Sequence, residues 1–219
     1  MPTQQEVESL LQKSPYSASN QATLEAYVDA QAQGQAPYYQ DANRSLLRIY
    51  QFSPQSANPS KIALILMLAL LEYPSTDILA FSYLVPARTQ KAEPCSSVLK
   101  CSKLLESCKF SEFWQAVGAI EGDDVLKNLV KNSTQKMQSA ILGVLALTYK
   151  SASVAKVNEA LNATSADAIT KLSHPSVESV QGDKVIFVAS SENTKRNRVF
   201  QEGVDFGAIA SLMAKVTSE

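Results

Sequence analysis

The longest uninterrupted apolar segment of the chain runs from Ile62 to Leu71 and contains ten residues. A helix needs about 20 apolar residues to cross a bilayer, so this segment is too short for a membrane anchor. A helix that is apolar on every side is instead buried among other elements. We therefore expect a central core helix over residues 61–72, with Ser60 as its N-cap and Tyr73-Pro74 at its end.

Short amphipathic segments separated by proline or polar breaks fill the remainder of the first 131 residues. Their apolar residues recur three and four positions apart, as in Leu24, Tyr27 and Val28. Glycine is scarce, at 7 of 219 residues, which favours helices over a sheet sandwich. Such an order of short antiparallel helices is typical of a helical-repeat (HEAT-like) domain, predicted over residues 1–131. The expected further helices cover residues 23–33, 41–50, 77–84 (capped by Ser75 or Thr76), 96–107 and 110–120, and another opens at Asp123-Asp124.

The pattern changes near residue 132. Segments whose apolar residues have helical spacing are followed by two short apolar strands around a Gln-Gly-Asp-Lys turn. A last amphipathic helix comes after the strands. Three helices followed by a hairpin is winged-helix order, so residues 132–219 are predicted to be a winged-helix domain with a C-terminal helix. The expected elements are helices over 135–147, 153–161 and 165–172, strands over 177–180 and 185–189, and a helix over 205–216, with Ser151-Ala152-Ser153 as a linker. The fold class is therefore mostly α, with a small β-hairpin.

Charge and composition exclude several classes of protein. Lys plus Arg (20) nearly cancels Asp plus Glu (21), whereas a chain that grips nucleic acid by its own charge is usually more basic. The first residues are polar, so no secretory signal is expected, and three cysteines do not predict a disulfide framework. We expect a cytoplasmic protein in a reducing compartment, without a membrane segment.

The residues for catalysis or metal binding are sparse. The single histidine, His174, precedes Pro175 at a predicted helix end, where an exposed or structural role is expected. Cys95, Cys101 and Cys108 are six and seven positions apart and lack a fourth ligand nearby, so they are interpreted as small core residues. The carboxylates of Asp123-Asp124 point apart, and no phosphate-binding glycine loop exists. We expect no catalytic residue, cofactor, metal or small-molecule substrate.

One predicted strand is a candidate partner interface. Val185, Ile186, Phe187 and Val188 are apolar on both faces of a strand, because successive side chains alternate. Only one face of a two-stranded wing can cover the domain's own core. The other face, or the strand edge, is therefore predicted to be buried by a neighbouring subunit through strand addition. An equal alternative is that the C-terminal helix covers it.

Two further clusters carry alternative interpretations. Lys195, Arg196 and Arg198 form a basic loop that either contacts RNA weakly or is simply solvated. The predicted third helix of the winged domain lacks such basic residues, so direct duplex binding through it is not expected. Trp114, with Phe110 and Phe113, has the helical spacing of core residues, although an interface anchor is the alternative.

Five segments in order along the chain, from residue 22 to residue 213, carry a family resemblance. They are Ala22–Val28, Ala42–Pro54, Leu104–Ala116, the hairpin around Gly182, and Val204–Met213. Together these segments resemble subunit k of eukaryotic translation initiation factor three. The resemblance covers nearly the whole chain and implies a helical-repeat domain fused to a winged helix, the build shared by subunits of the proteasome lid, the signalosome and the initiation factor.

The resemblance also implies a function. Members of this family are non-catalytic, pair with subunit l and other subunits of the factor, and belong to a complex that binds the small ribosomal subunit. A small scaffold subunit of the proteasome lid or signalosome is the alternative within the class. A stand-alone winged-helix RNA-binding protein is the alternative from another class, and its binding would weaken steeply as salt rises.

Overall fold

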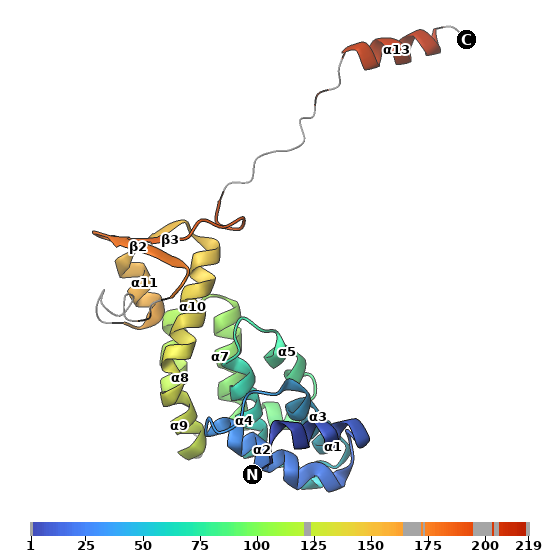
Figure 1. Ribbon diagram of the computed structural model, residues 1–219, viewed down its shortest axis with the longest axis vertical. Coiled ribbons are helices and arrows are strands. Elements are labelled where there is room, and N and C mark those ends of the chain that lie inside the picture. Colours follow the sequence, from blue (N-terminus) through green and yellow to red (C-terminus); the bar gives the residue numbers. More distant parts are fainter. Residues whose placement is uncertain are drawn as a thin grey trace.

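The computed structural model describes residues 2–120, 124–163, 172, 174–194, 203 and 206–217. A body of short helices leads into a long helix that reaches a small antiparallel sheet (Figure 1). This order confirms the predicted fold class, a helical array followed by a winged-helix unit. The helices before the winged unit are α1 (Gln4–Lys13), α2 (Gln21–Ala32), α3 (Gln40–Phe52), α4 (Pro59–Leu70), α5 (Asp77–Ser82), α6 (Ala87–Gln90), α7 (Cys95–Glu106), α8 (Phe110–Gly118) and α9 (Asp124–Asn132), with 3₁₀ turns at Ala18–Asn20 and Pro54–Ser56.

Helix α4 is the predicted core helix. No residue from Ile62 to Leu70 is more than 6% exposed, and α4 packs against α2, α3, α5, α7 and α9. The predicted cap was wrong. The side chain of Asn58, not Ser60, caps the helix by accepting a hydrogen bond from the Ser60 N–H at 3.0 Å. Pro59 occupies the first turn, where its missing N–H costs no helical hydrogen bond.

Two helices were not predicted. Helix α1 begins at a capping box, in which the Thr3 side chain accepts from the Glu6 N–H and the Glu6 carboxylate accepts from the Thr3 N–H. Helix α6 is a single turn between two proline breaks. The other predicted helices of this part are confirmed to within a few residues, although Asp123 lies outside the described residues.

The winged unit contains α10 (Thr134–Thr148), β1 (Ser151–Ser153), α11 (Val154–Leu161), β2 (Val177–Gln181) and β3 (Lys184–Phe187). The predicted hairpin is confirmed as β2 and β3, and Gly182 supplies the positive φ of +57° in its turn. The predicted helix over 165–172 lies outside the described residues, apart from Leu172. The boundary predicted near residue 132 falls between α9 and α10 and stays a prediction.

The segment interpreted as a linker, Ser151-Ala152-Ser153, is instead strand β1. It pairs antiparallel with β3, with Ser151 opposite Ile186, so the sheet order is β1-β3-β2. A three-residue strand has no alternating pattern of its own, and only its pairing with β3 makes it a strand. The hairpin is therefore the larger part of a three-stranded sheet.

Helix α8 joins the helical array to the winged unit. The Trp114 Nε1–H donates to the Ala160 carbonyl of α11 at 2.8 Å, and the Ser111 hydroxyl donates to the Glu159 carboxylate at 3.3 Å. Phe113 is 1% exposed and meets the Trp114 ring edge-on. Phe110 and Phe113 are thus core residues, as their spacing predicted, and half-buried Trp114 ties the two parts together.

The last helix is α13 (Phe206–Val216), and the predicted first residue, Asp205, lies outside the described residues. Phe206 is 81% exposed and Ile209 is 42% exposed, so these residues do not cover the outer face of β3. The predicted alternative in which this helix folds over the strand is therefore wrong for the structure described here.

Candidate functional site

The apolar run Val185–Val188 has its first three residues in β3 and its last directly after it, and its side chains divide between two faces. Val185 and Phe187 are 0% and 1% exposed and belong to the core, whereas Ile186 is half-buried and Val188 is 45% exposed. Alternation places Ile186 and Val188 on the opposite face from the two core residues. Val185 and Phe187 thus cover the chain's own core, as expected. The predicted partner interface is therefore limited to the side chains of Ile186 and Val188.

The surroundings of Ile186 define the outer sheet face. In the register of the sheet, Ser151 of β1 and Ser179 of β2 lie directly opposite Ile186. Directly opposite residues share a face of a sheet, so Ile186 is flanked by two small polar side chains. We use the term outer sheet face for Ser151, Ser179, Ile186 and Val188. On this face the apolar side chain of Ile186 lies between the two small serine side chains.

The side chain of Asn193 fixes the backbone at Val188, the last residue of the outer sheet face. Its Nδ2 group donates to the carbonyl of Val188 at 2.8 Å and to that of Ala146, in the last turn of α10, at 2.9 Å. Its Oδ1 atom accepts from the Ser190 N–H at 2.8 Å. The segment after β3 is therefore fastened to α10, and Val188 is presented in a fixed position.

The sheet order corrects one part of the interface prediction. Because β3 lies between β1 and β2, both of its edges are already paired within the chain. A partner cannot add a strand to β3, so that form of the prediction is wrong. The edges available for strand addition are the outer edges of β1 and β2.

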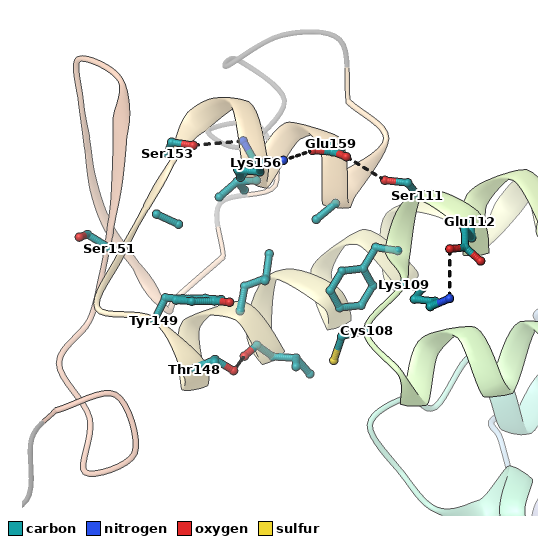
Figure 2. Close-up of a pocket in the computed structure, with 16 residues that line it drawn as sticks. Cys108, Lys109, Ser111, Glu112, Thr148, Tyr149, Ser151, Ser153, Lys156 and Glu159 are labelled. Atoms are coloured by element: carbon teal, nitrogen blue, oxygen red, sulfur yellow. Dashed lines mark hydrogen bonds and ion pairs between the residues drawn. The ribbon is translucent and has the colours of Figure 1, made fainter.

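A hollow of about 730 Å³ lies where α8, α10, β1 and α11 meet, and we call it the junction hollow (Figure 2). Ion pairs line its rim: Lys109 with Glu112 at 3.3 Å and Lys156 with Glu159 at 2.9 Å. This apolar hollow with a polar rim was not found from the sequence, because its walls come from segments far apart in the chain. Its apolar lining is Phe110, Val144, Leu145, Ala152, Val157 and Ala160.

The single histidine has a structural environment. His174 packs against Gly143 of α10, and its Nδ1 atom accepts a hydrogen bond from the Ser176 N–H at 3.2 Å. Desolvation lowers its pKa, which favours the neutral imidazole that this acceptor role requires. Within the described residues no hydroxyl or thiol hydrogen-bonds to His174, so this part of the chain offers it no nucleophile.

The cysteines divide into two buried thiols and one exposed thiol. Cys95 and Cys101 are buried in α7, and burial raises the pKa of each thiol to about 11. Cys108 is exposed just beyond that helix, with a positive φ of 55°, and it lines the junction hollow. Across the described residues no group of three His, Cys, Asp or Glu side chains could hold a metal ion. The core role predicted from the sequence is thus confirmed for Cys95 and Cys101 and wrong for Cys108, which is exposed.

This arrangement predicts a simple labelling result. A disulfide-forming thiol reagent at pH 8 should react rapidly with Cys108, while Cys95 and Cys101 should react only when the chain unfolds. A thiol with a pKa near 11 is only about one-thousandth thiolate at that pH, and burial also blocks the reagent. Stopped-flow absorbance should therefore show one fast equivalent, and Cys108→Ser should remove it. A fast phase that survives in Cys108→Ser would contradict this assignment.

The basic loop predicted to contact RNA, Lys195, Arg196 and Arg198, lies outside the described residues. Its role stays a prediction. In the described part of the chain, no helix is both long and apolar enough to cross a membrane.

A helical array continued by a three-stranded winged-helix unit places the chain in the class of folds that join a helical repeat to a winged helix. Residues 56–198 match the model of the CSN8/PSMD8/EIF3K family, and the chain belongs to that family.

Similar proteins agree with this assignment. The chain is 31% identical over 201 residues to eukaryotic translation initiation factor 3 subunit K of Homo sapiens, covering 91% of this chain and 89% of that protein. It is 34% identical over 139 residues to the protein of the same name from Dictyostelium discoideum, covering 64% of this chain but only 54% of that protein. The Xenopus laevis protein of this name is 30% identical, with 91% of this chain covered. The resemblance to the subunit k family is confirmed.

Proposed function

We propose that this chain is a non-catalytic scaffold subunit of the eukaryotic translation initiation factor 3 complex. The observation that carries the proposal is its 31% identity to the human subunit K across 91% of the chain. The described residues agree with a binding role, since their histidine and buried cysteines have structural environments. On this proposal the chain acts in the cytoplasm by burying surface against neighbouring subunits.

The neighbouring subunit is proposed to be subunit l of the same factor, and the outer sheet face is proposed to contribute to that contact. Ile186 and Val188 project from a sheet whose opposite face is held by Val185 and Phe187 in the core. A rigid apolar ridge loses little side-chain entropy when a partner covers it. The bond network of Asn193 adds to this rigidity by fixing the position of Val188.

Association with the small ribosomal subunit is proposed to occur through the complex. The chain has a net charge of −1, which provides little of the electrostatic affinity that direct RNA binding requires. Binding to the ribosome should therefore depend on the other subunits. The basic residues Lys195, Arg196 and Arg198 would add at most a weak RNA contact.

Density-gradient sedimentation tests this function. An epitope-tagged chain in its own cells, cross-linked before lysis, should sediment partly with small ribosomal subunits and partly as a free complex of other initiation-factor subunits. Replacing Lys195, Arg196 and Arg198 together with glutamine should leave this distribution within about twofold. If the chain sediments with proteasome-lid or signalosome subunits instead, the proposed complex is wrong. If the triple variant alone leaves the ribosomal fractions, direct RNA binding replaces the scaffold mechanism.

A further inference from the structure

The outer edge of strand β1 has unpaired backbone groups. The Phe187 N–H donates to the Lys150 carbonyl at 3.0 Å, and the Val154 N–H donates to the Asp183 carbonyl at 2.9 Å. Hydrogen-bonded pairs alternate along an antiparallel ladder, so Ala152 is the residue of β1 that bonds to β3 between these two points. The N–H groups of Ser151 and Ser153 therefore point away from β3, together with the Ser151 carbonyl. Among the described residues these three groups have no hydrogen-bond partner.

This free edge borders the junction hollow. Ser151, Ala152 and Ser153 form one wall of the hollow, opposite the start of α8 (Figure 2). The side chain of Tyr149, 50% exposed, points into it from the end of α10. An unpaired strand edge and an apolar recess thus lie side by side, although they arise from different parts of the fold.

The unpaired edge of β1 and the apolar hollow together favour an extended segment as the bound partner. A helix has no free backbone donors or acceptors along its side, so it would leave the Ser151 and Ser153 groups unpaired. An extended segment can pair with them while its alternate side chains enter the recess. The hollow has the volume of a typical small-ligand pocket, which suits one or two large side chains.

The charges on the rim of the hollow further restrict which kind of segment can bind there. Lys109 is paired with Glu112, and Lys156 is paired with Glu159, which also accepts from the Ser111 hydroxyl. Because each cation has a carboxylate beside it, the rim favours neither a strongly acidic nor a strongly basic segment. An uncharged segment with alternating apolar residues fits best.

We infer that the junction hollow is a docking site for a short, extended, uncharged segment of a partner protein. Its backbone pairs with Ser151 and Ser153, and an apolar side chain enters the recess beside Tyr149 and Phe110. This site lies on the β1 edge of the winged unit, away from β2, and Ser151 is the one residue that it shares with the outer sheet face. The inference does not depend on the identity of the complex proposed above.

Two variants and one control make the test specific. Ser151→Pro removes an N–H that points away from β3, and proline is tolerated at such positions of an edge strand. Thr148→Trp places a large side chain at an exposed position of α10 that lines the hollow, outside strand β1. Glu178→Pro places the same residue at an exposed position of β2, the other edge strand, beside the irregularity in its pairing with β3, and serves as the control. Thermal unfolding followed by circular dichroism checks that each variant folds.

The probe is a library of random octapeptides displayed on phage, selected on the full chain and then synthesised for titration. We expect selected peptides to bind Ser151→Pro and Thr148→Trp at least tenfold more weakly than the parent chain, and Glu178→Pro within twofold. Amide hydrogen exchange at Ser151 and Ser153, measured by NMR, should slow at least tenfold in the bound state.

Several results would overturn the inference. The inference fails if selection yields no peptide that prefers the parent chain to Thr148→Trp. It also fails if peptides bind without protecting the Ser151 and Ser153 amides. Equal affinity for Ser151→Pro would show that strand pairing has no part in binding. Protection of both amides without peptide, rising with protein concentration, would identify a second copy of this chain as the occupant and not a partner segment.

Discussion

Replacing Phe187 with alanine should lower the free energy of unfolding by about 3–5 kcal/mol, the usual cost of removing a buried aromatic side chain. Phe187 is 1% exposed and is among the largest fully buried side chains of the chain. It lies on the face of β3 that packs toward the core, so its loss leaves a cavity between the sheet and the helices. Urea unfolding followed by circular dichroism measures the effect.

Two valines, one in β3 and one directly after it, give the control. Val185→Ala should cost about 2 kcal/mol, because Val185 is fully buried, whereas Val188→Ala should cost less than about 0.5 kcal/mol at its 45% exposed position. The chemical change is identical, so the difference reports burial alone. Equal losses at the two valines would contradict the assignment of inner and outer faces.

Replacing Ile186 with aspartate should weaken binding to subunit l at least tenfold while the chain stays folded. A carboxylate at the centre of the outer sheet face would lose its hydration in the proposed interface without a counter-ion. In the free chain this position is only half-buried, so the cost to folding should be far smaller than that of Phe187→Ala. Isothermal titration of purified subunit l into each variant provides the measurement.

Tyr83→Asp is the matched control for this change. Tyr83 follows α5, far from the sheet in the sequence, and is 78% exposed, so it receives the same charge at another exposed apolar position. The affinity of the Tyr83→Asp variant for subunit l should stay within about twofold of that of the parent chain. If Ile186→Asp binds as tightly as Tyr83→Asp, the outer sheet face is not the interface.

Helix positions could be predicted because apolar spacing and proline breaks are local properties of the sequence. The error at α4 was also local: Asn58 and Ser60 are both good capping residues, and Pro59 at the first helical position should have favoured Asn58. Helix α1 carried a visible signal as well, since Thr3 and Glu6 have the spacing of a capping box. These features lay within reach of sequence reasoning.

The order of the strands and the junction hollow could not be predicted, because they depend on contacts between segments far apart in the sequence. Alternation correctly divided Val185 and Phe187 from Ile186 and Val188, but nothing in that strand shows which neighbours pair with it. The position of β3 at the centre of the sheet follows from β1, which has no pattern of its own. The junction hollow needs α8 and α11 to meet, and the bond from Trp114 to Ala160 that joins them is invisible in the sequence.

The most direct test of the central claim is affinity purification of the tagged chain from its own cells at ~0.5 M salt, followed by mass spectrometry. At this ionic strength the screening length is only a few ångströms, so an apolar interface survives while contacts through exposed charges are lost. We expect recovery of initiation factor 3 subunits, with subunit l the most abundant. Recovery of proteasome-lid or signalosome subunits would contradict the proposed function, as would RNA without any protein partner in a parallel purification at low salt.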